Sequence, residues 1–256
     1  EDNDAIYLLS ISLFLMIINW SIEAAKWKFL ITKISPVSFF QSLNAVLSGV
    51  TFSFFTPNRM GEFAGRVLHL PEGTRLRATF ATIIGNISQL IVTILVGTAA
   101  AGSIIQFFEI NQSLKWLIVG SVVIINFMLM IFYFKISAID KLLLKIKFFK
   151  QFEFHVHALS AYSKTELAKV LLLSFIRYLV FSTQYVLILK ALNIGAYWLD
   201  LYFPVAVVFL FITVMPSIAL TELAIRTSVA VAIIGLVSGN NLGILEASFI
   251  VWFINL

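Results

Sequence analysis

The 256-residue chain is strongly apolar, with 60% hydrophobic and only 12% charged residues, which excludes an ordinary soluble domain and indicates a helical integral membrane protein. It contains no cysteine, which excludes disulfides, thiolate metal sites and cysteine nucleophiles within it. Its net charge of +5 is explained by basic loops on one side of a membrane, so no nucleic-acid partner is expected.

Apolar stretches that suit membrane helices recur along the chain. In order, they cover residues 6–20, 37–55, 78–101, 116–134, 167–189, 201–215 and a tail from 218 onward. We therefore expect an all-α polytopic membrane protein that forms a single transmembrane domain over residues 1–256, with about six to eight membrane segments.

Basic residues predict which loops are cytoplasmic, because short cytoplasmic loops are enriched in Lys and Arg. Three loops carry such residues, and we expect all three on the cytoplasmic side. The third forms a basic amphipathic segment, 135–150, that is expected to lie at the inner surface. The residues are Lys26, Lys28 and Lys33, then Arg75 and Arg77, then Lys135, Lys141, Lys145, Lys147 and Lys150.

The region 37–70 is predicted to form a hairpin, because the loops before and after it are both expected to be cytoplasmic. Its turn falls at the sequence TPNRMG, where Pro57 lacks an N–H and disfavours helix at the preceding residue. Gly61 lets the backbone bend or approach a ligand closely. We expect this re-entrant turn near mid-membrane, inside protein or beside water.

A second hairpin, at about 201–237, is predicted to enter from the opposite side. Its first helix starts at an outer loop and breaks at Pro216, and the return segment leads to a turn at 238–241. Two broken-helix hairpins of opposite orientation would form an inverted repeat, an arrangement associated with membrane transport.

The same motif, made of a proline, a glutamate and an arginine, occurs in both hairpins. Each copy places Glu four residues before Arg, which stacks the two side chains on one helix face. Charge within apolar sequence is costly, so these residues mark either a ligand or ion site or a structural ion pair that locks the bundle. The copies are Pro57, Glu62 and Arg66, and Pro216, Glu222 and Arg226.

Other polar residues extend the candidate binding site. Arg59 follows Asn58 in the first turn, and arginine matches phosphate geometry. Arg177 lies in the middle of an apolar segment, where it must meet an acid, a carbonyl or a phosphate. Asn86 and Gln89 are weaker candidates, because interhelical hydrogen bonds explain most such residues.

We expect no enzyme activity, cofactor or metal site. No nucleophile, base and orienting group occur together, and no glycine-rich phosphate loop is present in the sequence. His155 and His157 form a pair with no third ligand nearby. A membrane-embedded hydrolase with Glu62 or Glu222 as the base is the catalytic alternative.

The sequence TPNRMGEFAGR resembles the Pro-Gly-Arg-x-Gly-Glu word of the lysylphosphatidylglycerol synthase transmembrane family, also called flippase-like proteins. Pro57, Arg59, Gly61 and Glu62 match this word, while Asn58 replaces its first glycine. The stretch 20–31 is also similar to the aromatic and basic end of an early helix in the family. The second word fits at its proline and glutamate but lacks the glycines between them.

The resemblance implies lipid handling by a multi-pass protein of the bacterial cytoplasmic membrane. Family members include the membrane part of proteins that move aminoacylated phosphatidylglycerol between leaflets, and relatives linked to polyprenol-linked lipids. The implied partners are anionic or aminoacylated phospholipids or polyprenol-linked lipids, with a second copy or a soluble transferase as a further partner. Synthase activity is not implied, because the aminoacyl-transfer domain of some members is not among these residues.

We therefore expect a flippase-like lipid translocase or a lipid-binding transporter with a central polar site. Arg59, Arg66 and Arg226 would receive a phosphate-bearing headgroup, and Glu62 and Glu222 would balance charge or bind an amine. The alternatives are an ion-coupled secondary transporter of a small anionic or zwitterionic solute and a non-catalytic membrane subunit of a lipid-modifying system.

Overall fold

The computed structural model describes residues 2–56, 60–104, 109, 111–136, 145, 160–195, 197–215 and 219–255. This part of the chain forms nine helices and no strand, which confirms the all-α polytopic class. Four helices are long and apolar enough to cross a membrane. They are α1 (Asp2–Ile31), α4 (Glu72–Ile104), α5 (Gln112–Phe134) and α9 (Lys164–Ala191).

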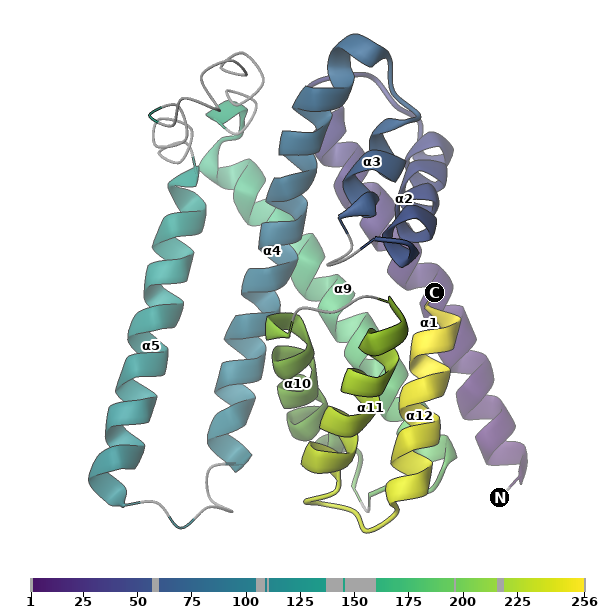
Figure 1. Ribbon diagram of the computed structural model, residues 1–256, viewed down its shortest axis with the longest axis vertical. Coiled ribbons are helices and arrows are strands. Elements are labelled where there is room, and N and C mark those ends of the chain that lie inside the picture. The colour runs from purple at the N-terminus through teal and green to yellow at the C-terminus, as the bar shows by residue number, and fades with distance from the viewer. Residues whose placement is uncertain are drawn as a thin grey trace.

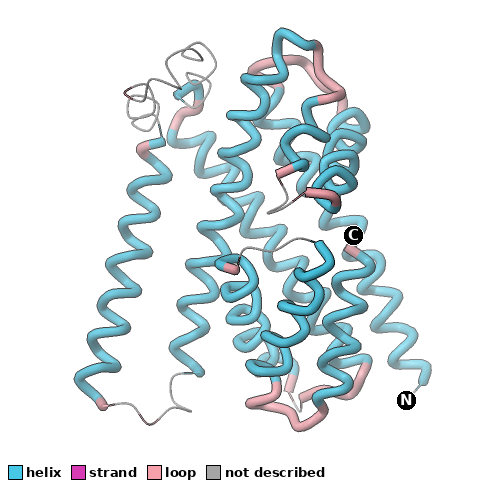
Figure 2. Tube along the Cα trace, viewed as in Figure 1, coloured by secondary structure: helices cyan, strands magenta, loops and turns pink. Residues whose placement is uncertain are grey.

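The other helices are short and occupy two different halves of the molecule (Figure 1). α2 (Phe39–Phe54) and α3 (Gly61–Val67) lie in the upper half. α10 (Trp198–Val214), α11 (Ala219–Ile234) and α12 (Asn241–Ile254) lie in the lower half. The α2–α3 and α10–α11 hairpins therefore approach the middle of the molecule from opposite ends, as the trace in Figure 2 also shows.

Two capping boxes fix where α2 and α9 begin. Ser38 Oγ accepts a hydrogen bond from Gln41 N at 3.1 Å, and Gln41 Oε1 accepts one from Ser38 N at 2.8 Å. Ser163 and Glu166 make the same reciprocal pair at the start of α9, at 3.3 and 2.8 Å. Each box satisfies backbone N–H groups that have no partner within the helix.

Glycines bring the short helices close to their neighbours. A Cβ on Gly65 of α3 would lie 2.6 Å from Ser48 O and 2.8 Å from Gly49 Cα of α2. A Cβ on Gly97 of α4 would lie 2.6 Å from Leu210 Cβ of α10. Small residues allow this close packing where no hydrophobic effect drives membrane helices together. Gly65 therefore brings the two helices of the first hairpin together, and Gly97 brings α10 of the second hairpin close to α4.

Buried apolar side chains form two clusters, one in each half of the molecule. The upper cluster contains Trp27 and Ile84 and draws on α1 to α5 and the start of α9. The lower cluster contains Tyr185 and Val205 and draws on α4 and α9 to α12. α4 and α9 contribute to both clusters, so they connect the two halves.

Two of the long helices extend into regions predicted as loops. α1 continues to Ile31 and α4 begins at Glu72, so Lys26 and Arg75 are helical. Nothing in the sequence ends α1 earlier, because no Pro or Gly occurs before Pro36. Lys26 is only 1% exposed. The prediction that Lys26 belongs to a cytoplasmic loop is therefore wrong.

Some predicted features lie outside the described residues. The predicted hairpin ranges 37–70 and 201–237 enclose α2–α3 and α10–α11, but their turns are not described. Of the segment 135–150, only residues 135, 136 and 145 are described. The predicted residues that fall outside are Pro57, Asn58, Arg59, His155, His157 and Pro216.

Candidate functional site

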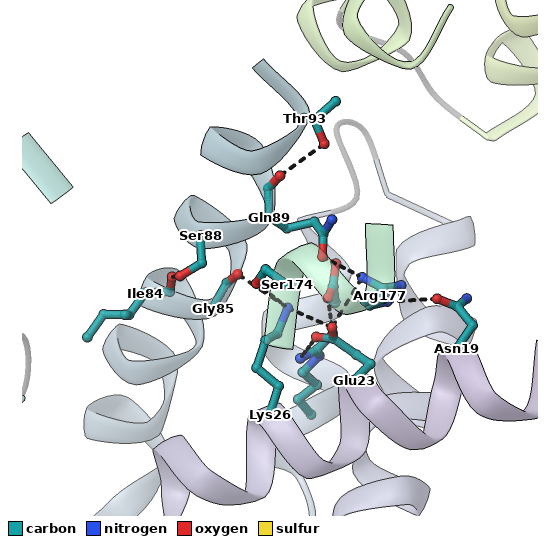
Figure 3. A network of polar contacts seen from close by, with 12 residues as sticks. Asn19, Glu23, Lys26, Ile84, Gly85, Ser88, Gln89, Thr93, Ser174 and Arg177 are labelled. Atoms are coloured by element: carbon teal, nitrogen blue, oxygen red, sulfur yellow. Dashed lines mark hydrogen bonds and ion pairs between the residues drawn. The ribbon is translucent and has the colours of Figure 1, made fainter. Parts of the chain in front are cut away.

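A buried carboxylate, Glu23 of α1, lies at the centre of an ionic cluster (Figure 3). Glu23 is 1% exposed. Its Oε2 atom lies 2.7 Å from Lys26 Nζ and 3.1 Å from Arg177 Nη1. Its Oε1 atom lies 2.9 Å from Arg66 Nη1. The three cations come from α1, α9 and α3, so one carboxylate connects three helices.

Arg66 bridges two carboxylates. Its Nη2 donates to Glu62 Oε1 within α3, and its Nη1 donates to Glu23 Oε1 of α1 at 2.9 Å. The pairing of Glu62 with Arg66 predicted from their spacing is therefore confirmed. The Arg66 side chain is 4% exposed and that of Glu62 is 17% exposed. Arg66 thus ties the first hairpin to α1.

Lys26 extends the cluster to α4 and α9 (Figure 3). Its ammonium donates to Gly85 O at 3.4 Å and to Ser174 Oγ at 3.5 Å, in addition to its ion pair with Glu23. The ionic cluster comprises two negative charges, on Glu23 and Glu62, and three positive charges, on Lys26, Arg66 and Arg177. Burial of such a group is tolerable because each charge meets an opposite charge.

Arg177 of α9 joins the ionic cluster to a cavity. Its Nε donates to Asn19 Oδ1 at 3.1 Å and its Nη1 to Gln89 Oε1 at 3.5 Å (Figure 3). Its guanidinium carbon lies 5.6 Å from the ring centroid of Trp20, within cation–π range. Arg177 was predicted to meet an acid, a carbonyl or a phosphate, and the structure shows an acid, Glu23. The Arg177 side chain is 22% exposed, so it still presents a surface to the cavity.

The cavity has a volume of about 250 Å³ and is lined by α1, α2, α4, α9, α10, α11 and α12. Ser53 at the end of α2, Thr213 at the end of α10 and Glu222 in the first turn of α11 all contribute to it. It therefore lies where the turning ends of the two hairpins face each other. Its aromatic lining comprises Trp20, Phe54, Tyr178, Phe181, Phe209 and Trp252.

The second glutamate–arginine pair lies in the cavity wall. Arg226 Nη2 donates to Glu222 Oε1 at 2.9 Å, which confirms the predicted pairing. The side chains are 9% and 13% exposed. Among the described residues, Glu222 is the ion-pair partner of Arg226, and Arg226 Nε is buried without a hydrogen-bond partner. Arg177, Glu222 and Arg226 are the charged side chains among the described residues of the wall.

Amide side chains continue the polar network from Arg177 into the lower half. Asn19 Nδ2 donates to Asn255 Oδ1 at 3.2 Å, and Asn255 Nδ2 donates to Gln184 Oε1 at 3.0 Å. Gln184 Nε2 donates to Ser12 O at 3.0 Å. Interhelical hydrogen bonds of this kind connect membrane helices, here α1, α9 and the end of α12.

The structure divides the predicted binding residues between the cavity and its surroundings. Gln89, Arg177, Glu222 and Arg226 line the cavity. The described residues that are predicted to bind substrate but do not line it are Gly61, Glu62, Arg66 and Asn86.

Gly61 supports the first hairpin through close packing. Its N–H donates to Thr56 Oγ1 at 2.7 Å, and a Cβ at this position would lie 2.7 Å from Phe52 C. The sequence predicted that Gly61 lets the backbone bend or approach a ligand closely, and the close approach that the structure shows is to α2, the other helix of its own hairpin.

Sequence reasoning missed the face of α1 that carries Asn19, Glu23 and Lys26. These residues are spaced four and then three apart, which places them on one helix face. A helix limited to residues 6–20 does not contain this pattern, whereas one continued to Pro36 does. Asn255 gave no comparable signal, because its partners lie far away in the sequence.

The fold and this cavity define a polytopic membrane protein with a charged site inside an apolar helix bundle. The chain belongs to the family described as lysylphosphatidylglycerol synthase TM region, whose model matches residues 4–256. The resemblance carried by TPNRMGEFAGR is thereby confirmed. No curated protein and no solved structure matched the chain. Membership relates the protein to membrane phospholipids and does not by itself define its activity.

Proposed function

We propose that the chain is a lipid translocase or lipid-binding transporter that moves a phosphate-bearing headgroup between leaflets through the cavity. The observation that carries this proposal is the pair of arginines in the wall, Arg177 and Arg226, which share it with Glu222, uncharged polar side chains and six aromatic side chains. Arginine binds phosphate through charge-assisted hydrogen bonds, which are strongest where water is scarce. The acyl chains would remain in the bilayer.

The two hairpins support a route from either leaflet. α2 and α10 have 16 and 17 residues, whereas α1 and α4 have 30 and 33. Helices of about 16 residues are shorter than the roughly 20 needed to cross a bilayer. We propose that both hairpins are re-entrant, form an inverted repeat in function, and open the cavity to one leaflet at a time.

We propose that the protein lies in the bacterial cytoplasmic membrane with its basic loops on the cytoplasmic side. It includes no catalytic step by this chain. Where the lipid is modified before it moves, a soluble transferase would supply that reaction as a partner, and a second copy of the chain is another candidate partner.

Translocation can be tested in proteoliposomes that contain phosphatidylglycerol with a fluorescent label on one acyl chain. A membrane-impermeant reductant bleaches the outer-leaflet label, and the wild-type protein should then expose the inner-leaflet label to bleaching. We expect Arg226→Gln to slow this second phase by about tenfold or more, because it removes a charged hydrogen-bond donor. Arg75→Gln, which changes a residue at the start of α4 with a 37% exposed side chain, is the matched control.

Equal bleaching in protein-free and wild-type vesicles would contradict translocation. If uptake of a small anionic solute instead follows an imposed ion gradient in the same vesicles, the secondary-transporter alternative replaces this proposal. Copurification with a soluble transferase, together with absent translocation, would favour a non-catalytic membrane subunit.

A further inference from the structure

Glu222 and Arg226 place a titratable group and an anion-binding group in one contact inside the cavity. Arg226 Nη2 donates to Glu222 Oε1 at 2.9 Å, and the two side chains are 9% and 13% exposed. Both residues line the cavity. Ionisable side chains inside a membrane bundle are costly, and they recur in proton relays and transport pathways.

The helices that pack against α11 bring no further charge to Glu222 in the described part of the cavity wall. α11 packs against α10 and α12. Their charged residues are Asp200, in the first turn of α10, and Glu246 of α12, and neither lines the cavity. The wall residues of α1, α2 and α4 are uncharged. The other charged or titratable groups of the described wall therefore come from α9.

One of the two wall arginines has unused hydrogen-bonding capacity. α9 contributes Arg177 and Tyr178 to the wall, and Arg177 Nη1 already lies 3.1 Å from Glu23 Oε2. Arg226 Nε, in contrast, is buried without a hydrogen-bond partner among the described residues. Arg226 can therefore accept a ligand, and Glu222 is the acid beside it.

An anionic ligand at Arg226 would compete with Glu222 for the same guanidinium. Phosphate and carboxylate oxygens both accept charge-assisted hydrogen bonds from arginine, and two anions beside one cation repel each other. A nearby negative charge favours the protonated form of a carboxyl group. Ligand binding therefore favours transfer of a proton to Glu222, because the proton removes the repulsion and leaves Arg226 to the ligand.

We propose that Glu222 takes up a proton when the cavity binds a phosphate ester and releases it when the ligand leaves, so that the protein carries both together. The contact between Arg226 Nη2 and Glu222 Oε1 breaks, Arg226 donates to the phosphate instead, and a proton from water adds to the carboxylate. The charges of the proton and of a singly charged phosphate diester cancel. This inference rests on the proposed function, because it assumes that the cavity is the ligand site.

Proton uptake can be measured on purified protein in a weakly buffered, uncharged detergent solution that contains a pH indicator. The probe is dihexanoyl phosphatidylglycerol, whose phosphate diester stays ionised near neutral pH, so that any proton taken up is taken up by the protein. Trp20 and Trp252 line the cavity, and their fluorescence reports binding in the same titration. Trp252→Phe checks that this signal arises in the cavity.

We expect the wild-type protein to take up close to one proton for each bound phosphatidylglycerol probe. Glu222→Gln keeps an oxygen that can accept from Arg226 but cannot gain a proton, so it should bind the probe and lose the proton uptake. Glu222→Asp, which keeps the carboxyl group, should retain the uptake. Glu246→Gln, the same change at an exposed position of α12, should behave as wild type.

The same coupling can be tested in the proteoliposomes, with the membrane voltage held at zero by valinomycin and equal potassium on both sides. An imposed pH gradient should draw the labelled lipid toward the alkaline side, and the fast phase of bleaching reports the share in the outer leaflet. We expect the ratio between the leaflets to change by up to about tenfold per pH unit, because each lipid travels with one proton. In Glu222→Gln this ratio should not respond to the gradient.

The outcomes separate the two proposals. Binding without proton uptake in the wild type, or unchanged uptake in Glu222→Gln, would overturn the proton coupling and leave the lipid-binding function in place. No binding of the probe would overturn both. Glycerophosphoglycerol has the headgroup without the acyl chains, and binding and proton uptake equal to those of the lipid would support the coupling and assign it to a soluble phosphate ester.

A second measurement covers the case in which Glu222→Gln fails to fold. Infrared difference spectra of the wild type should show the C=O band of a protonated carboxyl group when the probe binds, and Glu222→Asp should shift this band. A structural ion pair that stays intact would give no such band. Its absence would overturn the proton coupling.

Discussion

The first and second hairpins contain the same Glu-x-x-x-Arg pair, but the two pairs have different surroundings. Arg66 of the first pair also contacts Glu23 of α1, a third charged residue that is 1% exposed. Arg226 of the second pair contacts Glu222 and lines the cavity. The same local spacing therefore produces an ion pair that connects two helices in one half and a charged part of the cavity wall in the other. What surrounds the pair decides which of the two forms.

The largest effect is expected from Glu23→Gln. The substitution leaves three cations around a neutral amide, and removal of one partner of a buried ion pair costs about 3–5 kcal/mol. Thermal unfolding in detergent should show a strong loss of stability. Glu72→Gln, whose side chain is 90% exposed at the start of α4, provides the control and should have little effect. A small loss of stability in Glu23→Gln would mean that the ionic cluster does not stabilise the packing of α1 against α3 and α9.

A direct comparison of the two arginines comes next. Arg66→Gln should cost about 3 kcal/mol, because it leaves two carboxylates without their shared cation. Arg226→Gln should cost less, about 1–2 kcal/mol, because Arg226 contacts one carboxylate whereas Arg66 contacts two. Denaturation of both variants under one condition measures the difference. Equal losses of stability would contradict the different roles assigned to Arg66, which connects helices, and Arg226, which lines the cavity.

Gly65→Ala should have an intermediate effect on the first hairpin. Its new Cβ would lie 2.6 Å from Ser48 O of α2, and overpacking of this kind costs about 1–3 kcal/mol. Gly73→Ala at the start of α4 places its Cβ in open space and should be neutral or slightly stabilising. If Gly65→Ala leaves the stability unchanged, the first hairpin does not depend on close contact between α2 and α3.

The smallest effect is expected from Asn255→Ala. It removes hydrogen bonds to Asn19 and Gln184, and such bonds contribute about 0.6 kcal/mol each in membrane proteins. Lipid binding should change more than stability does, because Asn255 lines the cavity. Titration of wild type and variant with the phosphatidylglycerol probe measures this. An unfolding loss as large as that of Arg66→Gln would assign Asn255 to the structural network.

The sequence predicted most of the helices and the intrahelical pairs, because both depend on local patterns. Apolar length identified the membrane segments, and four-residue spacing identified Glu62 with Arg66 and Glu222 with Arg226. The partner of Arg177 required the packing of α9 against α1, which no local pattern contains. Lys26 was mistaken for a loop residue because burial of a lysine beside an acid depends on tertiary contacts.

No sequence pattern indicated that Glu62 and Arg66 lie outside the cavity. Both hairpins carry the same word, and only the approach of α1 to α3 separates their roles. The glycine-poor second copy gave the weaker sequence signal, yet its arginine lines the cavity. The role of each Glu–Arg pair therefore depends on the residues that surround it in the structure more than on the sequence motif that contains it.

The position of the cavity between two opposed hairpins also has an electrical consequence. A charge that crosses the whole membrane potential gains or loses about 2.3 kcal/mol per 100 mV. A headgroup of net charge −1 that rests midway would feel about half of this, about 1.2 kcal/mol per 100 mV, on each side, unless a proton on Glu222 cancels its charge. We therefore expect the membrane voltage to bias both the filling and the emptying of the cavity in Glu222→Gln, in the direction that moves negative charge outward when the cell interior is negative, and to affect the wild type far less.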